Sequence, residues 1–225
     1  MKTEKLGIIV PYIKNEKLLN IFILYMNNFM KHNYSHIDYE MIIVEQKNSE
    51  DVFKKGFLIN VGFDLCKKYI NYINIQDLNL LPISINYKFP DNPLLLSCNI
   101  YENNKTGYFF NSSTLNCSML MKKNDFLQIN GANNNSNEFV YEDINNRLKI
   151  VKNELIKHLI RNQSKQLIPM GNYIELKYNE IKLSNLNKDD ILKINYSKNG
   201  LSTLKYKIFN KEINVEKNYI KYIIC

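Results

Sequence analysis

The chain contains no tryptophan, and among its 225 residues only 7 are glycine and 5 are proline. This scarcity excludes collagen-like and Pro/Gly-rich low-complexity architectures, while 45% hydrophobic and 23% charged residues exclude global disorder. No apolar run approaches the roughly 20 residues that a membrane span needs. Pro11 and Lys14 interrupt the first apolar stretch, so no signal peptide is expected. We therefore expect a globular protein of the cytoplasm with no membrane partner.

Cysteine is also rare, and its four occurrences show neither a CxxC spacing nor a Cys/His zinc pattern. They are Cys66, Cys98, Cys117 and Cys225. This usage is typical of buried free thiols in a reducing compartment.

The formal net charge is +8. A basic chain attracts phosphate-bearing ligands or nucleic acid. Because the lysines are spread along the chain rather than gathered in one run, most are interpreted as solvated surface. A phosphate-binding cleft and a nucleic-acid face stay open as alternatives for the remainder. The excess of Asn, Lys, Ile and Tyr is typical of AT-rich genomes, including those of large DNA viruses.

Apolar patterning predicts an alternation of strands and helices in the first third of the chain. Residues 6–11 and 39–45 are short apolar runs typical of buried parallel strands, and residues 15–31 between them have the periodicity of an amphipathic helix. Strand, helix and strand at this spacing predict a βαβ unit. A second helix is expected to start at residues 49–51, and a third strand at 72–75.

The rest of the chain predicts a single α/β domain with a β-rich C-terminal end. No internal repeat or linker divides it. Residues 82–106 are expected to be irregular, 108–121 strand-like, 122–129 a short helix capped by Gly131, 142–161 a helix, and 173–178 and 201–209 strands.

Four segments, in order, resemble the β-1,4-galactosyltransferase family. Shorter pieces, Ile-Asn-Gly at 129–131 and Asp-Ile-Asn-Asn-Arg-Leu at 143–148, fall in the same order. The four segments are IIVPY at 8–12 with IIVEQ at 42–46, FKKGFLINVGF at 53–63, DLNLLP at 77–82, and NGLSTLKY at 199–206. The resemblance implies a Rossmann-like glycosyltransferase-A fold, a UDP-sugar donor and inverting transfer to a glycan or glycoprotein acceptor. It also implies a nucleotide-binding half at 1–82 and an acceptor half with the C-terminal strands at 83–225.

The resemblance places the donor site at the strand ends. Asp77 stands at the family's first Asp, which contacts the donor's ribose or sugar; the alternative is a turn aspartate that ends a strand. Lys55 stands where the family has Arg, and would contact phosphate as a point charge. Phe53 would pack near the uracil or belong to the core. The full set implied at the donor site is Pro11, Tyr12, Lys14, Phe53, Lys55, Asp77, Leu78 and Asn79.

The resemblance also implies a divalent metal ion, manganese, held in the family by the second Asp of Asp-Val-Asp with a Met and a His further on. Here the second Asp is Asn79, and a neutral amide oxygen is a weaker ligand for a hard cation. His158 falls where the family has its His, but the same stretch also reads as an amphipathic helix with His158 on its surface. The sequence therefore makes a metal cofactor doubtful.

The general base is assigned by the resemblance to Asp143 or Glu142. Aligned on Asn-Arg-Leu, the family's catalytic Asp falls near Tyr141, and a two-residue deletion would bring Asp143 or Glu142 into its place. The alternative is that both acids only favour a helix N-terminus. The family's tryptophan-rich loop is missing, which puts its acceptor sugar site in doubt.

The leading hypothesis is a UDP-sugar-dependent inverting hexosyltransferase that is slow or metal-independent. The main alternative is a protein that binds sugar or nucleotide on the same fold without turnover. A nucleic-acid-binding protein is a third hypothesis that rests on the charge alone.

Overall fold

The computed structural model describes residues 4–49, 51–97, 99–101, 118–136, 139–153, 157–158, 172–175 and 195–225. Its elements, in chain order, are β1 (Lys5–Ile13), α1 (Glu16–Asn33), β2 (Asp38–Gln46), α2 (Lys55–Cys66), β3 (Tyr72–Gln76), β4 (Leu80–Ser84), β5 (Leu94–Leu95), β6 (Asn99–Tyr101), β7 (Ser118–Lys122), α3 (Lys123–Gln128), α4 (Val140–Lys152), β8 (Lys157–His158), β9 (Asn172–Glu175), two 3-10 turns η1 (Tyr196–Lys198) and η2 (Leu201–Thr203), β10 (Ile208–Asn214) and β11 (Tyr219–Ile224).

The main sheet is mixed, with strand order β10-β11-β2-β1-β3-β7-β5-β8. Strands β11, β2, β1 and β3 run parallel, which confirms the predicted βαβ unit, while β7 and β10 are antiparallel to their neighbours. Strand β11 pairs with β2, so a segment near residue 220 lies beside the first βαβ unit in the same sheet. A smaller sheet has the order β4-β9-β6.

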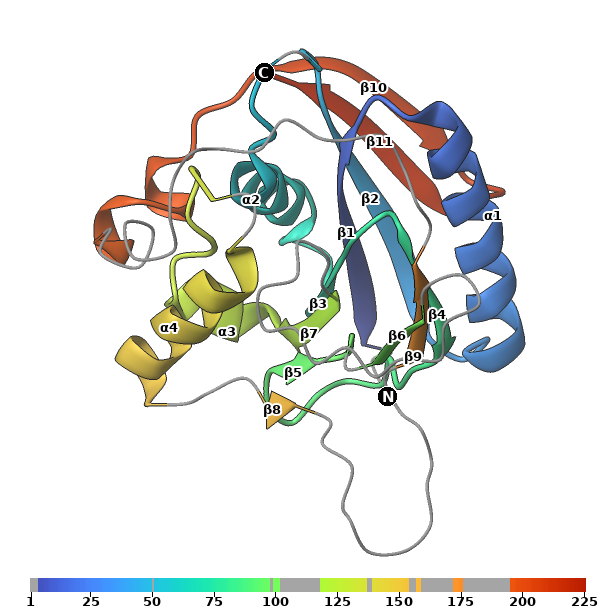
Figure 1. The fold of residues 1–225 in the computed structure, drawn as a ribbon, viewed down its shortest axis with the longest axis horizontal. Coiled ribbons are helices and arrows are strands. Elements are labelled where there is room, and N and C mark those ends of the chain that lie inside the picture. The colour runs from blue at the N-terminus through green and yellow to red at the C-terminus, as the bar shows by residue number, and fades with distance from the viewer. Residues whose placement is uncertain are drawn as a thin grey trace, which may run out of the picture.

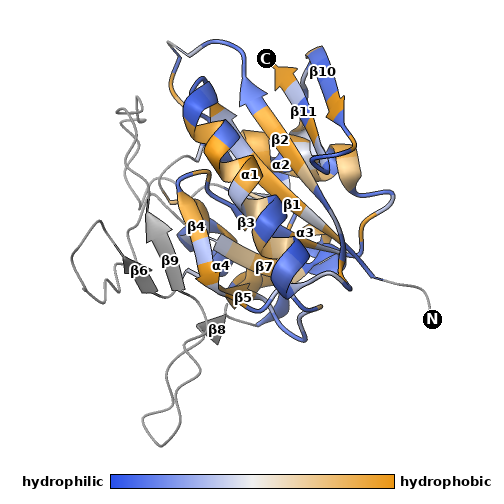
Figure 2. Cartoon of the chain, turned by 90° about the vertical axis from the view of Figure 1, so that its right-hand side faces the viewer, coloured by the Kyte–Doolittle hydropathy of each residue, from blue (hydrophilic) through white to orange (hydrophobic). Residues whose placement is uncertain are grey.

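Helices cover both faces of the main sheet (Figure 1). On one face α1 and the strand β4 pack over an apolar cluster that includes Phe22 and Met26. On the other face α2, α3 and α4 bury a second cluster that includes Phe63, Phe126 and Leu148. Figure 2 shows α1 with polar and apolar residues intermixed in front of the largely apolar strands β1 and β2. Within the described residues, no helix has the length and apolar character needed to cross a bilayer.

The first helix begins where the sequence predicts it. Asn15 caps α1, because its side-chain oxygen accepts a hydrogen bond from the backbone N–H of Leu18 at 3.1 Å. Glu16 lies in the first turn and Lys31 and His32 in the last, which complements the helix dipole.

The second helix begins at Lys55, so the predicted start at residues 49–51 is wrong. Gln46 explains the later start. Its side-chain amide donates to the carbonyls of Asn48 and Val52 at 3.0 and 3.2 Å, and its oxygen accepts from the N–H of Lys54 at 3.0 Å. The end of β2 thus holds the connecting loop in a non-helical path. All but three of the helix's residues are buried, as expected for a helix enclosed by other elements.

The fourth helix ends at Lys152, so the predicted continuation to residue 161 is wrong. Asn153 ends it in a left-handed conformation with φ of 54°, and donates its N–H to the carbonyls of Leu148 and Lys149. His158 therefore lies in a strand, β8, and the prediction that it lies on a helix surface is also wrong.

Three other predictions need correction. The stretch 82–106, predicted irregular, contains β5 and β6. The predicted strand 201–209 is instead η2 followed by an extended segment, and β10 starts only at Ile208. Cys66 is a buried free thiol as predicted, but Cys225, which follows β11, is exposed. Cys98, Cys117 and most of the predicted strand 108–121 lie outside the described residues.

Candidate functional site

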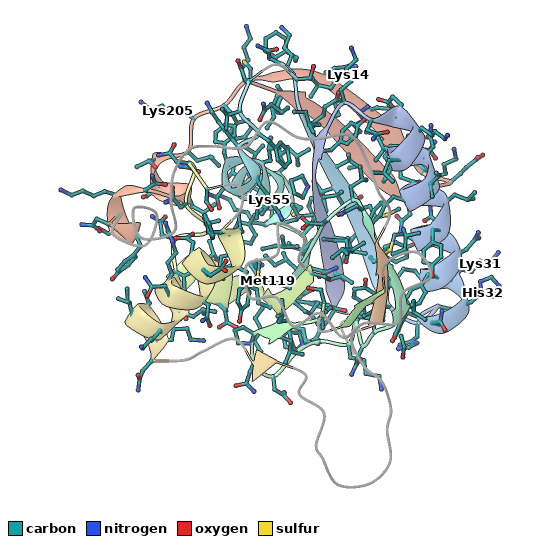
Figure 3. All side chains as sticks on the ribbon, in the orientation of Figure 1. Lys14, Lys31, His32, Lys55, Met119 and Lys205 are labelled. Atoms are coloured by element: carbon teal, nitrogen blue, oxygen red, sulfur yellow. The ribbon has the colours of Figure 1, made fainter. Side chains whose placement is uncertain are left out.

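A buried ion pair lies where β3 ends. Asp77 follows the last residue of β3, and its ion pair with Lys55 shows that it faces α2. Lys55, the first residue of α2, places its Nζ 2.7 Å from Oδ2 of Asp77. Their side chains are 5% and 8% exposed. Figure 3 labels Lys55 beside helix α2. The structure thus brings together two residues that the sequence assigned to the donor site.

The turn that carries Asp77 is fixed by a side chain that sequence reasoning missed. Gln76 donates to the carbonyls of Leu80 and Asp77 at 2.8 and 3.3 Å, and the N–H of Leu80 donates to the carbonyl of Asp77 at 3.1 Å. The Gln76 oxygen in turn lies 3.0 Å from the amide nitrogen of Asn74 and 2.8 Å from the hydroxyl of Ser118. All of these side chains are buried. The signal was available, because Asn74 and Gln76 are polar residues within an otherwise apolar buried strand.

The other residues predicted for the donor site are spread over both faces of the sheet. Pro11 is buried and, by alternation, shares the α2 face with the ion pair. Phe53 is 7% exposed and packs in the cluster beneath α2, as the core alternative predicts. Tyr12 points to the α1 face, and Leu78 packs against the same cluster. Lys14 is exposed, and Figure 3 shows it at the turn before α1, away from the ion pair.

On the α1 face, Tyr12 adjoins a charged cluster that the sequence did not indicate. Its ring centroid lies 5.1 Å from Nζ of Lys221. Lys221 also lies 2.9 Å from Oε2 of Glu45 and 2.7 Å from Oε1 of Glu16. Burial lowers the pKa of Lys221, but the bonds to Glu16 and Glu45 outweigh it, so the net effect is to raise that pKa above its ordinary value. This lysine is therefore charged and joins β11, β2 and the start of α1.

The start of α2 connects the ion pair to the start of α4. Gly56 donates its N–H to the carbonyl of Ser136 at 2.7 Å, and a Cβ at this position would lie 2.1 Å from the carbonyl oxygen of Asn133. Only glycine therefore permits this approach. The N–H of Asn133 then donates to Oδ2 of Asp143 at 2.7 Å. The predicted donor residues and the predicted bases lie on neighbouring elements.

Of the two candidate bases, Asp143 is engaged on both oxygens. Oδ1 accepts from Nε of Arg147 at 2.8 Å, and Oδ2 accepts from Asn133. Burial raises the pKa of Asp143, while Arg147 and the Asn133 N–H oppose that rise. Glu142 lies in the same first turn of α4 and is 8% exposed. Successive helix residues are about 100° apart around the axis, so Glu142 does not share the face on which Asp143 meets Arg147.

The residues at the end of β3 are a poor set of ligands for a divalent metal. Asn79 is 2% exposed and offers only a neutral amide, and Asp77 already faces the Lys55 ammonium. A resident cation at that position also repels a second cation. Of His158 the structure describes only the backbone, which pairs with β5. Among the described residues no three His, Cys, Asp or Glu side chains are grouped as a metal site.

Several pieces that carry the family resemblance meet in one hydrogen-bonded region, here called the asparagine joint and defined as residues 60, 130–134, 147 and 199–203. Asn60 of α2 accepts from the N–H of Ala132 at 2.9 Å and donates to its carbonyl at 2.7 Å. Asn130 accepts from the N–H of Ser202 at 2.8 Å, and its carbonyl accepts from Leu201 at 2.9 Å.

Two glycines and an arginine complete the asparagine joint. Gly131 and Gly200 have φ of 70° and 145°, and a Cβ on Gly200 would lie 1.9 Å from the carbonyl oxygen of Asn130. Arg147 donates to the carbonyls of Asn199 and Ile129 at 2.9 and 3.4 Å. These contacts tie the C-terminal segment to α2 and α4.

Comparisons with known proteins agree with this architecture. Residues 1–88 match the model of a family described as the N-terminal region of glycosyl transferase group 7. The chain is similar to the crystal structure of the catalytic domain of Drosophila β-1,4-galactosyltransferase 7 in complex with xylobiose. That match has a TM-score of 0.72 and 20% identity, and covers 99% of this chain and 94% of that one.

A mutant of the same Drosophila enzyme, in complex with manganese, UDP-Gal and xylobiose, matches with the same TM-score, identity and coverage. No curated protein matches the chain in sequence. The comparisons confirm the predicted resemblance to the β-1,4-galactosyltransferase family and the predicted glycosyltransferase-A-like fold.

Proposed function

We propose that this chain, whose fold is that of the β-1,4-galactosyltransferases, is a UDP-sugar-dependent enzyme that transfers a hexose to a glycan acceptor with inversion. One observation carries the proposal: the buried Lys55–Asp77 pair lies at the carboxyl end of β3. In open α/β sheets this edge is where ligands bind. The similar Drosophila enzyme binds UDP-Gal and xylobiose, so a uridine diphospho-hexose and a glycan are the first substrates to test.

The proposed roles follow from charge and position. Asp77 accepts hydrogen bonds from the hydroxyls of the donor's ribose or sugar, and the Lys55 ammonium stabilises the negative charge on the departing diphosphate. Glu142, in the first turn of α4, is the proposed general base, and its neighbour Asp143 is the alternative. Glu142 takes the proton of the acceptor hydroxyl while the oxygen of that hydroxyl attacks the anomeric carbon of the donor sugar. The bond between the anomeric carbon and UDP breaks on the opposite face of the sugar.

The test is release of UDP from a panel of UDP-hexoses, with xylobiose and other glycans as acceptors, with and without manganese. We expect release with at least one donor and acceptor. Glu142→Gln should lower the rate by about 100-fold or more and leave UDP affinity unchanged. Glu216→Gln, which alters an exposed acid in the turn between β10 and β11, is the matched control and should behave as the unaltered protein. No binding of any UDP-hexose under any condition would overturn the proposal.

A second candidate function is binding of a UDP-sugar without turnover. Two observations favour it: Asp143 is held in an internal ion pair, and an alignment without a gap puts Tyr141 at the family's catalytic position. The two functions differ in one measurement. If UDP-hexose binds but no UDP is released, and Glu142→Gln behaves like the unaltered protein, the binding function holds and the transferase is excluded.

A further inference from the structure

The donor site carries its own positive charge. Lys55 projects from the first turn of α2, where the positive end of the helix dipole adds to its charge. Its ammonium lies 2.7 Å from Asp77, and the two side chains are almost fully enclosed. Gln76 donates a hydrogen bond to the Leu80 carbonyl and so fixes the turn that carries the Asp77 carboxylate. Gly56 packs closely on the Asn133 carbonyl and so fixes the start of α2. The cation is therefore held in place by both elements that line the site.

Departure of a nucleoside diphosphate places negative charge on phosphate oxygens, and a cation must stabilise it. A divalent ion performs this task when carboxylates are free to hold it. Here the carboxylate of Asp77 faces an ammonium, and Asn79 supplies an uncharged amide in the same turn. A hard divalent ion prefers anionic oxygen ligands, so these residues do not fit one.

We infer that Lys55 is the built-in cation of the donor site, and that binding of the diphosphate therefore needs no divalent metal. This inference rests on the proposed function and specifies its chemistry. Asp77 keeps the lysine charged and oriented until the donor enters. The positive charge of Lys55 then stabilises the negative charge on the diphosphate.

Calorimetric titration of UDP into the full chain tests the inference. In EDTA and in manganese we expect dissociation constants that agree within about twofold. Lys55→Met should weaken UDP binding about 10- to 100-fold, as expected for loss of a charged hydrogen bond. Lys55→Arg should restore most of the affinity because it restores the charge. Lys31→Met is the matched control: Lys31 is exposed on the last turn of α1, and Figure 3 shows it far from Lys55.

Lys55→Met leaves Asp77 buried without its cation and can unfold the protein, so a second variant is needed. The pair Lys55→Met with Asp77→Asn removes both charges and should fold, with a UDP affinity weakened at least as much, because Asp77 also contacts the donor in the proposed function. A third variant, Lys55→Met with Asn79→Asp, supplies two carboxylates and no lysine. We expect its UDP affinity to rise at least tenfold on addition of manganese.

Two outcomes separate this inference from the proposed function. If the unaltered protein binds UDP only in manganese, the built-in cation is wrong and the transferase stands. If Lys55→Met with Asp77→Asn binds UDP as tightly as the unaltered protein, the built-in cation and the proposed donor roles of this pair are both wrong. If UDP binds in neither condition, the proposed function fails and the inference fails with it.

Discussion

The asparagine joint and the proposed donor site differ in how closely each matches the family pattern. The joint is formed by segments that match the pattern, with Asn60, Gly131 and Arg147 at the centre of its hydrogen bonds. The proposed donor site departs from the pattern at Lys55 and Asn79. The joint holds α2, α4 and residues 199–203 together, and its contacts depend on backbone geometry. The properties of the proposed site depend on its charged side chains, and a single substitution can change the charge there without altering the fold.

The largest expected effect is at the centre of the joint. Arg147→Met would leave Asp143 buried without its cation and would remove the bonds to Asn199 and Ile129. We expect a loss of about 3–5 kcal/mol in the free energy of unfolding, measured by urea denaturation. UDP affinity of the folded fraction should not change. If Arg147→Met is as stable as the unaltered protein but fails to bind UDP, Arg147 acts in ligand binding rather than in stability, and the prediction is wrong.

A slightly smaller effect is expected at Gly200. Gly200→Ala forces a side chain into a backbone conformation with φ of 145° and places Cβ against Asn130. Strain alone costs about 1–3 kcal/mol, and the contact adds to it. Thermal unfolding should show the loss, with Gly7→Ala as a comparison, since its Cβ would meet only side-chain atoms, the nearest at 3.1 Å. Equal stability of the two variants would contradict a close backbone approach in the joint.

A substitution of Gln76 is expected to affect both stability and UDP binding, because this side chain stabilises the fold and also fixes the turn that carries Asp77. Gln76→Leu would remove the partner of the Leu80 carbonyl and should lower the free energy of unfolding by about 1–3 kcal/mol. It should also weaken UDP binding about tenfold, because the turn at Asp77 relaxes. Calorimetric titration of UDP at a temperature where the variant is folded separates the two effects. Unchanged affinity would show that Gln76 acts on stability alone.

The smallest expected effect is at Asp64, a partly exposed residue of α2. Burial raises the pKa of Asp64, but hydrogen bonds from Lys67 and Tyr206 outweigh it and hold that pKa below its ordinary value of 3.8. A lowered pKa contributes stability that is present above 3.8 and is lost as the pH falls through the folded-state value. Asp64→Asn should cost at most about 1 kcal/mol at neutral pH, because the pair is partly exposed. Unfolding curves at pH 7 and pH 3 should show the difference shrinking with acidification; a constant difference would contradict it.

Local sequence patterns were sufficient to predict the positions of β1, α1, β2 and β3. Strands β1, β2 and β3 and helix α1 lie within two residues of their predicted bounds, because apolar runs and helical periodicity act over neighbouring residues. The start of α2 and the course of residues 201–209 were mispredicted. Gln46 determines the first through side-chain hydrogen bonds within its own loop, and the bond between Asn130 and the distant Ser202 determines the second. Side-chain hydrogen bonds of this kind leave no periodic signal in the sequence.

For the site, the sequence named Lys55 and Asp77 from the resemblance, and the structure joins them. It also named Tyr12 and Lys14, which the structure places on the α1 face and on the surface. Lys221 was not singled out from the sequence, and Gln76 was not assigned its role in holding the turn, although each is a polar residue in an apolar strand. A polar residue at a predicted core position indicates a buried network, but the sequence does not reveal its partners.

By itself the sequence determined the βαβ beginning, the parallel strands, the family resemblance and the chemical identity of each charged group. Those properties are encoded in local patterning and side-chain type. Only the tertiary structure decided that Asp143 is bound by Arg147, that Lys55 faces Asp77, and that β11 pairs with β2. Each of these depends on which distant elements pack together, and packing is a property of the whole chain rather than of any segment.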